Sequence, residues 1–181
     1  FNLEPYIPTG SLVTAATLKL RANPSLGIND PQSIGIYRLK RPWVSDEVTW
    51  DEAAAGVPWA SGGADDTIVD RGDVSYDTIV VDDSFYALYT WDITELVNEW
   101  VQNPAANYGL IMLATSPIPV RHRFCSTEWP QVDHRPELVV TYIGAATVPT
   151  PTATPGTGTT TPSVGPTVGP TAGTETFNPI K

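Results

Sequence analysis

The chain has 181 residues, a formal net charge of −10 and a sequence pI near 4.4. Its length fits one domain with an additional segment, since a domain commonly holds ~100–200 residues. An acidic chain lacks the basic patch that neutralises phosphates, so nucleic acid is not an expected partner. No apolar run is long enough to cross a bilayer, so no membrane insertion is expected. The single cysteine, Cys125, excludes a disulfide framework within the chain.

The first 143 residues have the pattern of short strands separated by turns rich in Pro, Gly and Asp. In Leu12–Ala22, side chains alternate with the period of two that is typical of a strand. Further strands are predicted at 34–39, 48–50, 68–69, 79–81, 87–91, 108–115, 121–126 and 137–143. Short strands at such spacing predict an all-β fold, an antiparallel β-sandwich.

One short amphipathic α-helix is predicted within this β-rich region, over Thr94–Gln102. Its apolar side chains fall at i, i+3, i+4, i+7 and i+8, which is one face of a helix. These residues are Ile93, Leu96, Val97, Trp100 and Val101. Asp92 is the predicted N-cap, with Glu95 at the spacing of a capping box. Pro104 predicts the end of the helix because it lacks an amide donor and restricts Asn103.

The segment 144–181 differs in composition from the rest of the chain. It is rich in Thr, Pro and Gly and holds almost no large apolar side chain. Such a segment cannot bury enough surface to offset the entropy of ordering its backbone. We therefore expect an extended or disordered linker that joins this domain to other domains of the same parent chain, and we expect residues 147–181 to pack on nothing. The alternative is a tail without a role.

Five short motifs occur in one order along residues 1–143. They are FNL…IPTG…ATLKL within Phe1–Leu20, VTW at Val48–Trp50, WDIT…LV…W…NYGL within Trp91–Leu110, F.S.E at Phe124–Glu128 and RPEL…Y within Arg135–Tyr142. This order resembles the DNRLRE-domain family. The resemblance implies a jelly-roll β-sandwich over residues 1–143 whose first strands are missing. It also implies a non-catalytic carbohydrate-binding module of secreted and cell-surface proteins. Some members bind acidic polysaccharide, but the acidic charge of this chain favours a neutral glycan.

Aromatic side chains in turn-rich segments are the candidates for glycan contact. Trp59, Trp129 and Tyr76 lie in such segments, and aromatic faces in loops are platforms for sugar rings. The alternative is that each ring covers a loop over the core. The other aromatic residues considered are expected in the core: Trp43, Trp50, Trp91, Trp100 and Tyr108.

Acidic residues between 65 and 83 are candidates for a structural calcium site. Asp65, Asp66, Asp70 and Asp73 lie on turns, and calcium takes six to eight oxygen ligands from such loops. No EF-hand spacing is present. The alternative is a solvated acidic rim that keeps the protein soluble.

Catalysis is not expected. Neither of the two histidines, His122 and His134, lies in a recognisable triad or metal motif. The sequence therefore favours an extracellular, non-catalytic module that attaches a larger protein to a polysaccharide or cell-surface glycan. The alternative is a structural stalk or adhesin repeat with no glycan ligand.

Overall fold

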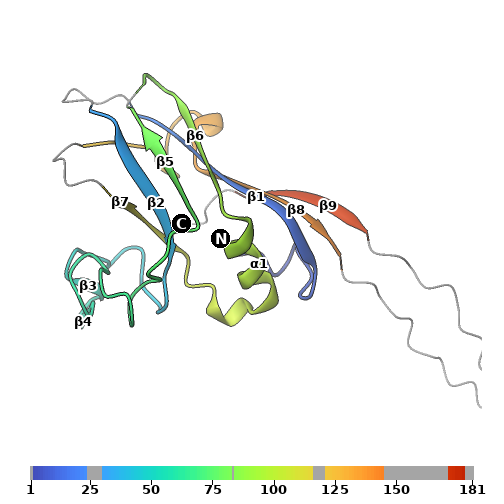
Figure 1. Ribbon diagram of the computed structural model, residues 1–181, viewed down its shortest axis with the longest axis horizontal. Helices are drawn as coiled ribbons and strands as arrows, with labels where there is room; N and C mark the ends of the chain where they lie inside the picture. The colour runs from blue at the N-terminus through green and yellow to red at the C-terminus, as the bar shows by residue number, and fades with distance from the viewer. Residues whose placement is uncertain (1, 24–29, 83, 116–120, 145–170, 178–181) are drawn as a thin grey trace, which may run out of the picture.

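The computed structural model describes residues 2–23, 30–82, 84–115, 121–144 and 171–177 (Figure 1). Its strands are antiparallel and it contains one α-helix, which confirms the predicted all-β class. The strands are β1 (Leu12–Arg21), β2 (Gln32–Arg38), β3 (Glu52–Ala54), β4 (Val57–Pro58), β5 (Asp77–Val81), β6 (Leu88–Asp92), β7 (Leu110–Ala114), β8 (Glu137–Ile143) and β9 (Ala172–Phe177). The helices are α1 (Thr94–Gln102) and the 3₁₀ turns η1 (Pro104–Ala106) and η2 (Val132–His134).

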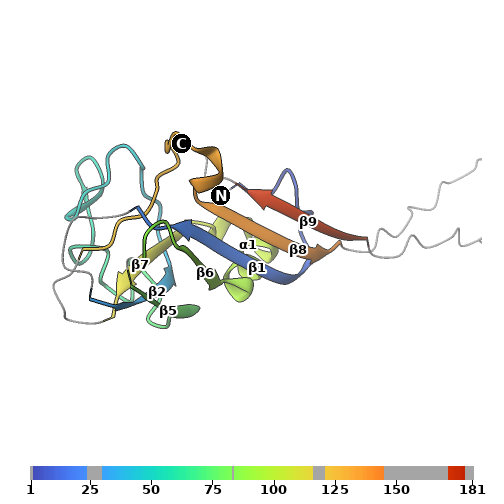
Figure 2. The same cartoon turned by 90° about the horizontal axis from the view of Figure 1, so that it is seen from above.

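Two sheets enclose the main core. The first has the strand order β6-β1-β8-β9 and the second has the order β5-β2-β7 (Figure 2). The chain passes between the sheets at several connections, because β1 is followed by β2 and β7 by β8. Within the core, the Trp91 indole on β6 is fully buried and donates a 3.0 Å hydrogen bond to the Ile34 carbonyl on β2. This bond joins the two sheets and satisfies the polar edge of a large buried ring.

Helix α1 buries its apolar side chains against the core, and its bounds match the prediction. The Thr94 hydroxyl accepts a 2.9 Å hydrogen bond from the Ala16 amide, which fixes the start of the helix to β1. The N-cap is Ile93 and not Asp92, and no capping box forms. The Asp92 carboxylate accepts instead from the Thr94 amide and hydroxyl. These two bonds hold the pKa of Asp92 below its usual range, and the bond from the hydroxyl is the larger cause.

The chain between β2 and β5 forms an excursion, residues 39–76, with a small core of its own. Its buried side chains are Leu39, Ala53, Trp59 and Ala64. The hairpin β3–β4 belongs to this excursion and lies at one end of the molecule, away from β9 (Figure 1). The predicted strands at 48–50 and 68–69 are wrong, because these residues lie in turns and irregular chain. The predicted strand at 121–126 is reduced to one bridge, from Phe124 to Ala22.

The prediction that residues 147–181 pack on nothing is wrong for the described part of that segment. Strand β9 pairs antiparallel with β8 over its whole length, with Phe177 opposite Leu138. Phe177 is only 7% exposed and belongs to the main core. Alternating small polar residues followed by an aromatic one were enough for a strand, despite the composition around them. Residues 145–170 and 178–181 lie outside the described residues.

Candidate functional site

Trp50 is the most exposed tryptophan that the described residues contain, at 72%. Its indole lies against the backbone of Gly62 and Gly63. A Cβ built on Gly63 would be 2.6–2.9 Å from three atoms of the six-membered ring, and one on Gly62 would be 2.7 Å from the indole nitrogen. Both rings of the indole therefore rest on the two glycines, while most of the side chain faces solvent. We call this arrangement of Trp50, Gly62 and Gly63 the Trp50 platform.

The backbone holds the platform in place. The Gly63 amide donates a 2.6 Å hydrogen bond to the Trp50 carbonyl. Gly63 has φ +73°, in the left-handed region that favours glycine. A side chain there would meet both the strained backbone and the ring, so the sequence needs glycine at this position.

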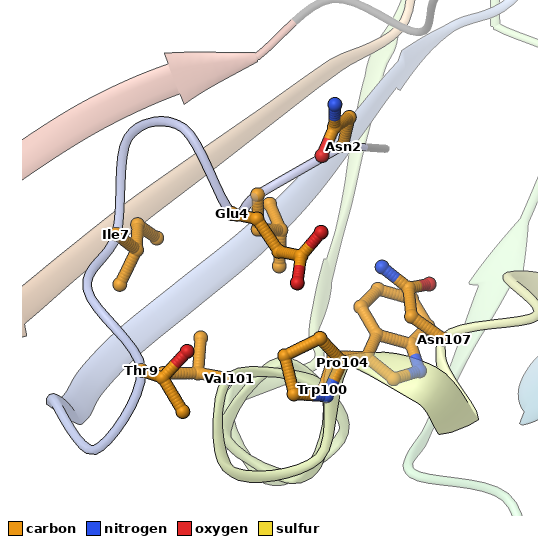
Figure 3. Close-up of a pocket in the computed structure, with 9 residues that line it drawn as sticks. Asn2, Glu4, Ile7, Thr9, Trp100, Val101, Pro104 and Asn107 are labelled. Atoms are coloured by element: carbon orange, nitrogen blue, oxygen red, sulfur yellow. The ribbon is translucent and has the colours of Figure 1, made fainter.

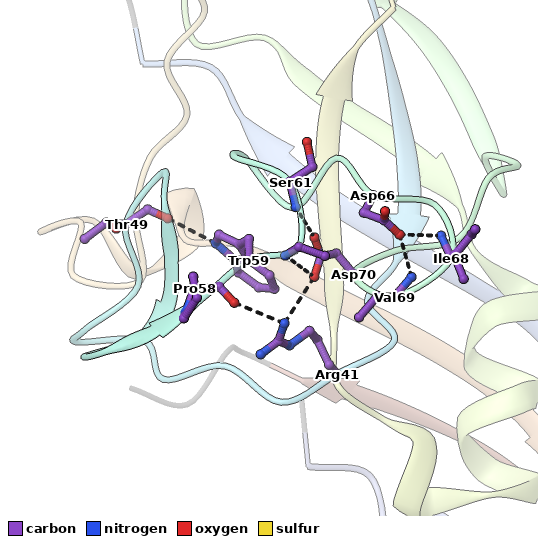
Figure 4. A network of polar contacts seen from close by, with 10 residues as sticks. Arg41, Thr49, Pro58, Trp59, Ser61, Asp66, Ile68, Val69 and Asp70 are labelled. Carbon is purple, nitrogen blue, oxygen red and sulfur yellow. Dashed lines mark hydrogen bonds and ion pairs between the residues drawn. The ribbon is translucent and has the colours of Figure 1, made fainter.

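Trp59 fixes both neighbours of Trp50. Its indole nitrogen donates to the Thr49 carbonyl at 3.2 Å (Figure 4). Its amide donates to the Asp51 carbonyl at 2.9 Å. The Trp59 ring is 8% exposed and packs in the small core of the excursion. Its burial overturns its prediction as a stacking face, because a ring inside the core offers no surface to a sugar. Its place in the structure is to anchor the segment that presents Trp50.

A buried carboxylate fixes Trp59 in turn (Figure 4). Asp70 is completely buried and accepts from the amides of Ala60 and Ser61, at 3.1 and 3.0 Å. Arg41 makes an ion pair with Asp70 at 3.4 Å and lies over the Trp59 ring, 5.7 Å from its centre. This charge pairing and the two amide bonds satisfy the buried carboxylate. Support for the platform therefore runs from Asp70 through Trp59 to Trp50.

The surroundings of the exposed ring are polar and acidic. The Asp51 carboxylate lies close to Gly62, where the indole nitrogen of Trp50 also lies. Neither that carboxylate nor that indole nitrogen has a hydrogen-bond partner within the described part of the chain. A flat apolar face beside a free acceptor and a free donor can bind a ring that carries hydroxyl groups.

The other two predicted aromatic contacts have different environments. Tyr76 packs against the main core and donates a 2.9 Å hydrogen bond to Glu99, which also pairs with Arg38. Burial, and next the bond to Glu99, raise the pKa of Tyr76 to about 12. Trp129 is half-buried in the loop before η2, and its carbonyl accepts from Arg135 at 2.8 Å. The structure does not join these three aromatic residues into one surface, and Trp129 stays a prediction.

The four predicted calcium ligands point to different partners. Asp70 pairs with Arg41, and Asp65 pairs with Arg71 at 2.6 Å. Asp66 accepts from the amides of Val69 and Ile68, which hold its pKa below the usual range. Asp73 lines an open depression beside Tyr76. No group of three ligating side chains converges anywhere in the described ranges, so the predicted calcium site does not form.

Trp43, also expected in the core, is exposed at 38% and donates to the Tyr108 carbonyl at 2.7 Å. The expectation of a core position was therefore wrong for both Trp43 and Trp50.

A separate cavity of about 280 Å³ lies between the N-terminal turn and α1 (Figure 3). Ile7 and Trp100 line it with Glu4, the one carboxylate among its described lining residues, which include no histidine or cysteine.

The two facing antiparallel sheets and the aromatic excursion define a β-sandwich module of the class that serves as a unit of larger proteins. The chain belongs to the Disaggregatase related repeat domain family, whose model matches residues 1–140. A search of curated proteins found no match. The family finding overturns the resemblance to the DNRLRE family. The motifs behind that resemblance mark β1, α1 and β8, which are fold positions that different sandwich families can share.

Sequence reasoning missed Trp50 because it belonged to one of those motifs. The signal that could have found it is the pair Gly62-Gly63 shortly after it in the chain. Two adjacent glycines leave a flat strip of backbone on which an aromatic ring can lie.

Proposed function

We propose that this repeat domain is a non-catalytic module that binds a polysaccharide through the Trp50 platform. The observation that carries the proposal is the exposed indole, held flat on Gly62 and Gly63 and anchored from below by Trp59. A preorganised aromatic face binds a sugar ring without the cost of ordering a loop. The two residues beside Trp50 in the chain, Thr49 and Asp51, are both hydrogen-bonded to Trp59, so the exposed ring is presented from a fixed segment.

The ligand that fits best is a neutral polysaccharide. The net charge of −10 and the Asp51 carboxylate beside the ring repel acidic polymers. Carboxylate oxygens accept hydrogen bonds from sugar hydroxyls, and the indole nitrogen donates one. The contact is mainly apolar burial, so we expect binding to survive moderate salt.

The module acts outside the cell, as part of a larger protein that it places on a polymer or a cell surface. Support comes from its membership in a family of repeat domains and from the Thr/Pro-rich composition of residues 145–170, typical of spacers between modules. No helix in the described ranges has the length and apolar character to span a bilayer.

A panel of neutral and acidic polysaccharides in native affinity gels tests the proposal. Retardation by at least one neutral polymer, unchanged by moderate salt, is the expected result. Retardation only by acidic polymers, or by none, would contradict it and favour a structural repeat without a glycan ligand. The unfolded protein in the same gels controls for trapping by the matrix.

A further inference from the structure

Strand β9 lies outside the residues that define the family unit. The family match ends at residue 140, within β8, and β9 begins at Ala172. Yet β9 completes the sheet: it covers the outer edge of β8 with six paired residues (Figures 1 and 2). The unit therefore has an edge that accepts a strand from beyond itself.

The pairing is specific in register. A Cβ on Gly173 would lie 2.7–3.0 Å from three atoms of the Tyr142 side chain, so a larger residue at this position would displace the ring that crosses the strand. Phe177 then reaches the main core and meets Tyr6 edge-on, with ring centres 5.4 Å apart. On the opposite face, the hydroxyls of Thr141 and Thr174 lie 3.5 Å apart. A strand shifted by one residue would lose all three contacts.

The attachment of β9 to its own chain is long. Residues 145–170 separate the ends of the paired region, where the Gly144 amide donates to the Thr171 carbonyl. A chain of that length spans at most roughly 90 Å when extended, which is enough to reach a neighbouring domain. The strand is described in contact with β8 and with the N-terminal turn, and it contributes one side chain to the core.

We propose that the β8 edge is a strand-exchange site, and that its occupant can be Ala172–Phe177 of a second copy of this chain. Strand addition supplies main-chain hydrogen bonds for affinity, and Gly173 and Phe177 supply the register. Each copy then offers one strand and accepts one, which links copies without a new interface. Strand exchange at the β8 edge does not depend on glycan binding at the Trp50 platform.

Disulfide trapping between two forms of the full chain tests the exchange. One form carries Thr141→Cys and the other carries Thr174→Cys with a larger tag, and the two are unfolded together, refolded and oxidised. The native Cys125 is buried and stays in place. We expect at least about tenfold more disulfide-linked heterodimer than in a control mixture in which Thr67→Cys replaces Thr141→Cys. Thr67 is an exposed position in the excursion. A yield no higher than with Thr67→Cys would overturn the proposal.

Two further variants keep the test decisive. A single chain that carries both Thr141→Cys and Thr174→Cys should form the bond internally, and its failure would overturn the register itself. Gly173→Val, added to the Thr174→Cys form, should abolish the heterodimer because the new side chain meets Tyr142. Thr176→Val on the exposed face of β9 is its matched control and should leave the yield unchanged. Equal yields from the two valine variants would contradict strand exchange through this register.

Discussion

The indole of Trp50 rests on Gly63, and the amide of that glycine donates a 2.6 Å hydrogen bond to the Trp50 carbonyl. The same two residues thus belong to the Trp50 platform and close the turn that supports it. Because Gly63 makes both contacts with Trp50, a substitution at Gly63 should change the position of the ring most directly.

Gly63→Ala should destabilise the platform for two reasons, the left-handed backbone and the collision with the ring. A non-glycine residue in that conformation costs roughly 1–2 kcal/mol, before the collision is added. Gly56→Ala is the matched control, because Gly56 has the same φ of +73° with nothing within 4 Å of its Cβ position. Denaturant titration should give a larger loss for Gly63→Ala. Equal losses would mean that the ring does not rest on Gly63.

Asp70→Ala should destabilise the protein by about 3 kcal/mol, since it leaves two amides and the Arg41 charge without their buried partner. Asp65→Ala is the control, because its carboxylate is exposed and its pair with Arg71 should contribute under ~1 kcal/mol. Denaturant titration of both variants measures the difference. If the two lose similar amounts, Asp70 does not support the excursion.

Tyr76 should ionise with a pKa of about 12, raised first by burial and then by its hydrogen bond to Glu99. Since the folded pKa lies above the usual value of 10.0, the stability that this group contributes is complete below pH 10 and is lost as the pH rises through about 12. Spectroscopic titration of the tyrosinate, compared with Tyr76→Phe, isolates its step. Glu99→Gln should lower the pKa but leave part of the shift, because burial is the larger cause. A step near 10 would show an exposed ring.

Trp100→Ala and Trp50→Ala remove the same side chain from opposite environments. Trp100 is 3% exposed on α1 and its loss should cost about 3–5 kcal/mol, the range for a buried aromatic. Trp50→Ala should cost under ~1 kcal/mol, since little of its surface is buried. Denaturant midpoints of the two variants decide the matter. Similar costs would contradict the assignment of one ring to the core and the other to the surface.

The helix could be predicted because its determinants are local. The apolar periodicity and Asn103-Pro104 set its bounds, and only the cap was placed one residue early, since Asp92 binds Thr94 from outside the helix. The two tryptophans of the excursion could not be assigned in this way. Trp59 is buried because it packs with Leu39, which lies far from it in the chain, and Trp50 is exposed because Gly62 and Gly63 hold it from one side. Neither contact leaves a periodic pattern.

Strand β9 escaped prediction for a related reason. Composition over 144–181 averages six strand residues with many more that are mostly Thr, Pro and Gly. The fit of Gly173 to Tyr142 and of Phe177 to the core depends on a strand formed far earlier in the chain. The candidate calcium site failed because nearness in sequence did not place Asp65, Asp66 and Asp70 around one point.

The most direct test of glycan binding at the Trp50 platform is the retardation of Trp50→Ala in affinity gels. The gels contain a neutral polysaccharide that retards the wild type. Trp43→Ala is the control, as another exposed tryptophan outside the main core. We expect Trp50→Ala to lose at least about tenfold in affinity, the order of a lost aromatic contact, with its fold intact by denaturant titration. Full retardation of Trp50→Ala would contradict the platform as the binding surface.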